Sequence, residues 1–130
     1  MTTSSTPRAV AEEFLAALAQ RDYDAMARSL HPEVAFRALL PSRLAELDGS
    51  AAAIDEIRGW FGDAKEFTMV ASGVEDVEDR ARFWCKIELR DDDGWAIVEQ
   101  TGFCDTDGDA LTLVNLVCSG WRAIDRPHGA

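Results

Sequence analysis

The sequence is poor in the residues from which metal sites and disulfide frameworks are built. Its three cysteines are Cys85, Cys104 and Cys118, and no two of them are spaced as CxxC. An odd number of cysteines without that spacing argues against both a disulfide framework and a zinc site. The two histidines are His31, at an expected helix end, and His128, in the expected tail. We therefore expect no cofactor and no metal, buried free thiols that act as small apolar groups, and a reducing cytoplasmic location.

Positive charge and long apolar runs are also scarce. The 24 acidic and 13 basic residues give a net charge of −11, which repels phosphate backbones and anionic membrane surfaces. No run approaches the roughly 20 apolar residues that a membrane-spanning helix needs. The first residues, MTTSSTPRAVAEE, contain no apolar segment of a secretory signal. We therefore expect no nucleic-acid partner and no membrane partner.

The rest of the composition is that of one globular domain. A chain of 130 residues suggests a single domain, and 47% hydrophobic residues suffice for a buried core. We expect this domain over residues 7–123, after a disordered tail at 1–6 and before a polar tail at 124–130.

Apolar residues at helical or alternating spacing predict an α+β arrangement of three helices and five strands. Asp22 is a good N-cap for the second helix, and Ser50 for the third. The helices are expected near 7–21, 23–31 and 50–61, and the strands near 34–40, 66–74, 80–90, 94–106 and 109–121. Residues 41–49 are expected to form a polar, charged loop.

The stretch 94–121 is expected to form two central strands joined by a tight turn. Asp107 and Gly108 form an Asp-Gly pair between two apolar runs, which is a strong hairpin signal. A two-residue turn at this pair would place Gln100 opposite Asn115, with both side chains on one face. Because side chains alternate between faces, a different loop with an odd shift would break this match.

The loop at 91–94 sets a second register. If these four residues form the turn, Cys85 faces Gln100 in the neighbouring strand. Lys86 then faces Glu99, and opposite charges across a ladder attract one another.

The segments AEEFLAALAQRDYDAMARSLHPEVAF and LVCSGWR, with this order of elements, resemble the nuclear transport factor 2-like superfamily over about residues 8–123. The superfamily includes ketosteroid isomerases, SnoaL-like polyketide cyclases, limonene epoxide hydrolases and scytalone dehydratases. The resemblance implies a cone-shaped, cystatin-like fold with three N-terminal helices packed on a curved, mainly antiparallel sheet. It says little about activity, because one fold hosts many chemistries.

The ketosteroid isomerases need an aspartate base, a tyrosine and a protonated aspartic acid. In this sequence the tyrosine position falls on Phe14 and the base on Ala38. The second acid falls on Gln100, or on Glu99 if the turns slip by one. The resemblance therefore implies no steroid isomerase activity, and the histidine–aspartate and Arg–Asp–Asp sets of related enzymes are not found either.

The resemblance places the Gln100 face toward the helices, as an apolar pocket that contains two amides. Those amides either orient a ligand's carbonyl or hydroxyl group, or bond to each other and to buried water. Glu99 would face this pocket only if the register were wrong by one. The expected pocket residues are Phe14, Phe36, Ala38, Trp60, Phe83, Cys85, Val98, Gln100, Asn115 and Val117.

The opposite face carries too much apolar surface for a monomer, and members of the superfamily commonly dimerise through it. The expected interface of a homodimer is formed by Trp84, Trp95, Ile97, Phe103, Val114 and Leu116. These features predict a protein that binds a small apolar molecule, and any enzyme activity would be that of a SnoaL-like cyclase, isomerase or hydrolase without cofactor. The alternatives are a non-catalytic dimerisation module whose cavity is filled by side chains, or a recruitment domain whose tryptophan face stays exposed.

Overall fold

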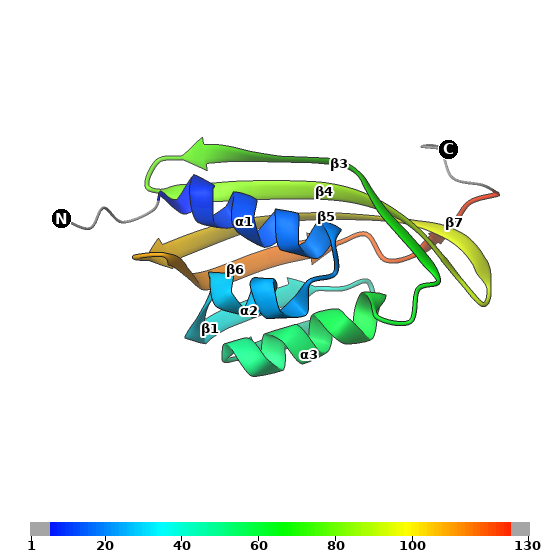
Figure 1. Ribbon diagram of the computed structural model, residues 1–130, viewed down its shortest axis with the longest axis horizontal. Coiled ribbons are helices and arrows are strands. Elements are labelled where there is room, and N and C mark those ends of the chain that lie inside the picture. Colours follow the sequence, from blue (N-terminus) through cyan, green and yellow to red (C-terminus); the bar gives the residue numbers. More distant parts are fainter. Residues whose placement is uncertain (1–5, 126–130) are drawn as a thin grey trace.

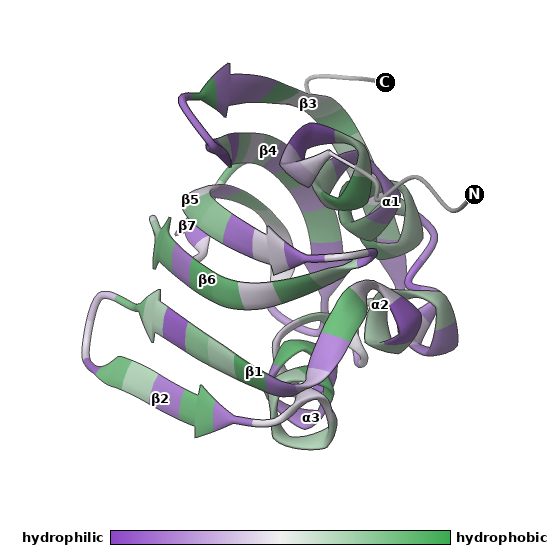
Figure 2. Ribbon diagram, turned by 90° about the vertical axis from the view of Figure 1, so that its left-hand side faces the viewer, coloured by the Kyte–Doolittle hydropathy of each residue, from purple (hydrophilic) through white to green (hydrophobic). Residues whose placement is uncertain are grey.

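The computed structural model describes residues 6–125, which form a curved sheet with helices on one side (Figures 1 and 2). His128 and most of the two expected tails lie outside the described residues. The helices are α1 (Pro7–Ala19), α2 (Tyr23–Ser29) and α3 (Ser50–Phe61). The strands are β1 (Leu30–Leu39), β2 (Leu44–Asp48), β3 (Glu66–Val77), β4 (Arg80–Asp91), β5 (Gly94–Asp107), β6 (Ala110–Cys118) and β7 (Arg122–Ala123).

The sheet has the strand order β2-β1-β6-β5-β4-β3, and the short β7 pairs with β5. The pairing of β1 with β6 is parallel, and the other strand pairs are antiparallel. The predicted α+β class with a mainly antiparallel sheet is thus confirmed. The helices do not form one N-terminal block, however, because α3 follows β1 and β2. None of the helices in the described part of the chain is long and apolar enough to cross a membrane.

The helices begin at side-chain caps that the sequence supplies. The Thr6 hydroxyl oxygen accepts a hydrogen bond from the Ala9 N–H at 3.1 Å, and Pro7 follows as the first helical residue. Asp22 caps α2 as predicted, accepting from the Ala25 N–H at 3.1 Å. These caps fix where α1 and α2 start, and so which of their side chains face the sheet.

Arg21 lies in the turn between α1 and α2, and its side chain forms hydrogen bonds at the C-terminal end of α3. Its Nη1 donates to the carbonyl oxygens of Phe61 and Ala64, at 2.9 Å each. Its guanidinium carbon also lies 5.0 Å from the centroid of the Phe67 ring, a cation–π distance. This one side chain therefore satisfies carbonyls at the end of α3 and holds the helices against the start of β3.

The predicted loop at 41–49 contains a strand, β2, that pairs with β1. Ala45 is buried opposite Ala38, whereas Glu46 and Asp48 leave charged positions at the edge of the sheet. Charged edge strands resist association with other sheets. The same charged residues are why the sequence pattern predicted a loop where β2 lies. Gly49, with a φ of 100°, occupies the N-cap of α3, so the predicted cap at Ser50 was wrong.

The predicted register between β4 and β5 is confirmed. Cys85 pairs with Gln100, and Lys86 pairs with Glu99. The Lys86 ammonium lies 3.9 Å from a carboxylate oxygen of Glu99. The Asp-rich turn thus fixes the pairing of the two longest central strands.

The predicted register between β5 and β6 was wrong. The turn lies at Gly108 and Asp109, since Asp107 pairs with Ala110. Gly108 is the first central residue and has a φ of 63°, as a type II′ turn requires. A bulge between the Thr106–Leu111 and Asp105–Leu113 pairs then adds one residue to β6.

The shifted turn alone would have kept each side chain on its predicted face, but the extra residue reverses them. Gln100 pairs with Cys118, and Asn115 pairs with Phe103. Val114 and Leu116, predicted on the outer face, are buried beneath the helices at 0% and 4% exposure. Asn115 is exposed on the outer face and is not a partner of Gln100.

Candidate functional site

The space between the helices and the sheet is filled by side chains. Most of the residues predicted to line a pocket meet there, and their exposed fractions lie between 0% and 4%. These buried residues are Phe14, Phe36, Ala38, Phe83, Cys85, Val98 and Gln100. The remaining three differ: Trp60 is half-buried, and Asn115 and Val117 are exposed on the other side of the sheet. These side chains pack closely against one another, and two of them, Cys85 and Gln100, also line a hollow of about 590 Å³.

The packing around Gly102 shows how tightly this interior is closed. A Cβ atom placed on Gly102 would lie 2.8 Å from the Phe83 ring and 3.0 Å from the Asn115 carbonyl oxygen. The Phe83 ring also packs against Phe14, with centroids 6.0 Å apart. A glycine on β5 thus provides the room that an aromatic side chain fills, as close approach inside a sheet requires.

Gln100 is the central polar group of this interior. Its Nε2 donates to the Cys118 sulfur at 3.5 Å, and the Gly120 N–H donates to the same sulfur at 3.4 Å. Burial, with a smaller effect of Cys118, raises the pKa of the Cys85 thiol to about 12. An amide and a protonated thiol do not take a proton near neutral pH, so this row of side chains offers no general base.

Glu99 lies on the outer face, as the favoured register requires. One carboxylate oxygen lies 3.9 Å from the Lys86 ammonium, and the other lies 3.6 Å from the Arg122 guanidinium. The alternative in which Glu99 faces the interior is thereby wrong. Within residues 6–125 there is also no group of three or more side chains that could hold a metal ion.

The outer face of the sheet carries exposed apolar side chains, two of which, Trp84 and Val117, line the hollow of about 590 Å³ that also reaches Cys85 and Gln100. We call Leu39, Trp84, Phe103 and Val117 the outer apolar patch; their exposed fractions are 50%, 38%, 40% and 51%. Of the predicted interface residues, Trp84 and Phe103 belong to this patch and Trp95 is half-buried. Ile97 is buried at 5% exposure, and Val114 and Leu116 are core residues.

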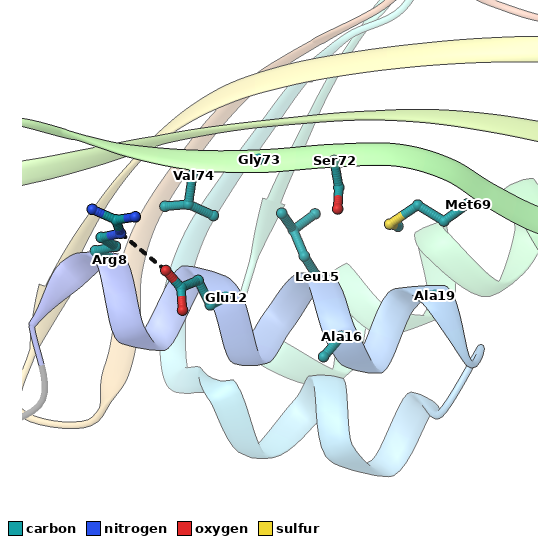
Figure 3. Close-up of a pocket in the computed structure, with 9 residues that line it drawn as sticks. All are labelled: Arg8, Glu12, Leu15, Ala16, Ala19, Met69, Ser72, Gly73 and Val74. Atoms are coloured by element: carbon teal, nitrogen blue, oxygen red, sulfur yellow. Dashed lines mark hydrogen bonds and ion pairs between the residues drawn. The ribbon is translucent and has the colours of Figure 1, made fainter.

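Sequence reasoning missed a groove between α1 and β3, which has a volume of about 420 Å³ (Figure 3). Its walls are formed by Arg8, Glu12, Leu15, Ala16, Ala19, Met69, Ser72, Gly73 and Val74. No residue pattern in the sequence pointed to this groove, because it depends on how α1 packs beside an edge strand. The lack of a side chain at Gly73 makes room on the opposite face, where a Cβ atom placed on it would lie 2.6 Å from Nε1 of Trp84.

The fold places this chain among solved structures of related architecture. No protein-family model matches the sequence, and no curated protein sequence matches it either. A ketosteroid isomerase-like protein from Kribbella flavida is 19% identical with a TM-score of 0.68, over 98% of this chain and 85% of that chain. An NTF2-like protein of unknown function from Burkholderia pseudomallei is 15% identical with a TM-score of 0.68, over 86% and 89%.

A third structure has the same architecture. A SnoaL-like protein from Shewanella denitrificans is 12% identical with a TM-score of 0.66, over 87% of this chain and 90% of that chain. Such identities support an inference about fold and none about activity. The chain therefore has the fold of the nuclear transport factor 2-like superfamily.

Proposed function

We propose that this protein is a non-catalytic domain that acts as a homodimer, with the two subunits joined through the outer faces of their sheets. The observation that carries the proposal is the outer apolar patch, whose four side chains are each between 38% and 51% exposed. Monomers seldom expose contiguous apolar surface of this kind without a binding role.

The surroundings of the patch support an interface. Ion pairs border it: Lys86 and Arg122 with Glu99, Arg37 with Asp48 at 3.1 Å, and Arg82 with Glu75. Arg82 Nη1 also donates to the Thr101 hydroxyl at 3.1 Å. An apolar centre with a polar, internally paired rim is the usual composition of a protein interface.

The chemistry of three interior side chains supports the non-catalytic part of the proposal. Phe14, Ala38 and Gln100 occupy the positions that correspond to the isomerase tyrosine, base and second acid. None of these side chains transfers a proton near neutral pH. Turnover by that chemistry would need groups that these positions do not provide.

The test is the mass of the protein in solution, measured by light scattering during size-exclusion chromatography. We expect a dimer at micromolar concentration, and we expect Trp84→Glu with Phe103→Glu to give a folded monomer. Gln20→Glu, which adds a negative charge at an exposed position just after α1, is the control and should remain dimeric. A monomer mass for the wild-type protein would contradict the proposal.

Binding of a small apolar molecule is a second candidate, supported by one polar atom. The Tyr23 hydroxyl is buried and has no hydrogen-bond partner among the described residues. A ligand carbonyl or hydroxyl group that reached this hydroxyl would satisfy it. Native mass spectrometry of the purified protein would reveal a co-purified molecule, and Tyr23→Phe should reduce its occupancy. A wild-type mass without added ligand would count against this candidate.

A further inference from the structure

The strand β3 ends the sheet on one side. In the described part of the chain its only strand partner is β4, so its other edge is open. An open edge presents backbone N–H and C=O groups that can pair with another extended chain. β3 has 12 residues, twice the usual length of a strand, so the edge is long enough to hold a peptide.

The groove between α1 and β3 runs beside this edge (Figure 3). Leu15, at 5% exposure, forms its apolar floor, and Ala16 and Ala19 keep the helix wall low. Met69, Ser72 and Val74 line the opposite wall, on the strand. A chain added to the edge of β3 would direct every second side chain toward this groove, since side chains alternate along a strand.

The bulge and the charged side chains that would protect the β3 edge from pairing with another chain are absent from the 71–74 stretch of β3 beside the groove. Proteins guard open edges with bulges and charged side chains, and β3 has a bulge between Met69 and Ala71. An acidic run begins at Glu75. The stretch between them, Ala-Ser-Gly-Val at 71–74, is uncharged, and three of its four residues line the groove.

Charge decides which partner fits. Glu12 lines the groove, and an acidic run follows the 71–74 stretch along the chain, with Glu75 and Asp76 at the end of β3 and Glu78 and Asp79 in the turn after it. Arg8 connects the two walls at one end of the groove, with its guanidinium 3.0 Å from Glu12 and 3.7 Å from Asp76. A second copy would bring the same acidic run to the edge and be repelled, whereas a basic chain would be attracted.

We propose that the 71–74 edge of β3 binds an extended, basic peptide segment of another protein by strand addition. Backbone hydrogen bonds to β3 hold the segment, one apolar side chain enters the groove over Leu15 and Ala16, and flanking lysines or arginines face the acidic rim. Main-chain pairing with pockets for alternate side chains is an established mode of peptide recognition. This site is separate from the outer apolar patch, so a dimer would carry two of them.

The proposal is tested with a library of labelled synthetic peptides that alternate lysine with valine, leucine, isoleucine or phenylalanine. Binding to the full-length protein is measured by fluorescence anisotropy. We expect at least one member to bind, its glutamate counterpart to bind about tenfold more weakly or worse, and N-methylation of alternate peptide bonds to abolish binding. Amide chemical shifts should change at 71–74 and along the α1 wall.

Two variants and a matched control locate the site. Ala16→Gln fills the groove from α1, and Ser72→Lys places a lysine on the open edge. Each should weaken binding about tenfold or more. Ala51→Gln makes the Ala16 substitution at an exposed position of α3 and should leave the affinity within about twofold. Circular dichroism spectra should be unchanged in all three variants.

Three results would overturn the proposal. No peptide of the library binds; binding survives both N-methylation and the groove variants; or the groove binds an apolar dye, anilinonaphthalene sulfonate, while no peptide binds. The last result would assign the groove to small apolar ligands instead.

Discussion

Gly102 on β5 is a residue at which the packing of the interior leaves no room for one more carbon atom. A Cβ atom there would clash with the Phe83 ring at 2.8 Å, so Gly102→Ala must displace that ring or the strand. Overpacking of this kind costs about 1–3 kcal/mol. We expect a lower free energy of unfolding in urea.

Gly59 provides a control, because replacing it by alanine should raise stability instead of lowering it. It lies within α3, and nothing lies within 4 Å of a Cβ atom placed on it. Alanine there should therefore raise stability by about 0.5–1 kcal/mol through its helix propensity. If both alanine variants changed stability alike, backbone freedom rather than the Phe83 contact would be the cause.

The buried thiols give a residue-scale prediction about pH. Burial raises the pKa of Cys85 from 9.0 to about 12, and burial with the nearby Asp105 charge raises that of Cys104 to about 11. Only the thiolate reacts with disulfide reagents. We therefore expect Ellman's reagent at pH 8 to react slowly with the native protein and rapidly after unfolding in urea.

The same shifts make stability depend on pH. Above about pH 9 the unfolded chain releases thiol protons that the folded chain retains, so the free energy of unfolding should fall as pH rises toward about 11. The urea midpoint measures this slope. A Cys85→Ala, Cys104→Ala variant should have a shallower slope than the wild type, and an equal slope would assign the effect to other groups.

At the scale of elements, local sequence signals predicted helix starts and one strand register, but they did not predict features that depend on tertiary packing. Asp22 correctly predicted the start of α2. The turn before β5 correctly predicted the register in which Cys85 pairs with Gln100. The bulge in β6 carried no such signal, because Thr112 sits among residues typical of any strand. The extra residue in β6, which no sequence signal predicted, was therefore enough to move Asn115 from the predicted pocket to the outer face.

The candidate sites follow the same rule. Trp84 and Phe103 were predicted on the outer face from the alternation of side chains along their strands, and the prediction is confirmed because β4 and β5 pair without interruption. The groove beside β3 depends on how α1 lies against an edge strand, which spacing within the sequence does not specify. Sequence patterns assign a residue to a face of its own strand, but the neighbours across a gap come from packing.

The bulge at Thr112 can be tested by deletion. Removing this residue would shift the register of β6 by one, turning Val114 and Leu116 to solvent and Asn115 into the core. We expect loss of cooperative thermal unfolding and exposure of apolar surface to a fluorescent dye. Thr112→Ala keeps the extra residue and should unfold cooperatively near the wild-type temperature; a cooperative deletion variant would show that the bulge does not set the faces of β6.

At the scale of the whole molecule, net charge and surface charge have different effects on association. Each subunit carries −11, so two subunits repel one another at long range. Around the outer apolar patch, by contrast, the charged side chains are paired within the subunit, as Arg82 is with Glu75 and Lys86 with Glu99. Repulsion should therefore come from the molecule as a whole and not from the interface.

This separation predicts that salt strengthens the proposed dimer. Raising NaCl from about 50 to about 500 mM shortens the screening length from roughly 14 to roughly 4 Å, so the dissociation constant from analytical ultracentrifugation should fall several-fold. Gln20→Lys with Ala51→Lys lowers the net negative charge by two at exposed positions on the helical side. This variant should dimerise more tightly at low salt and respond less to added salt. A dissociation constant that rises with salt would mean instead that ion pairs across the interface hold the subunits together.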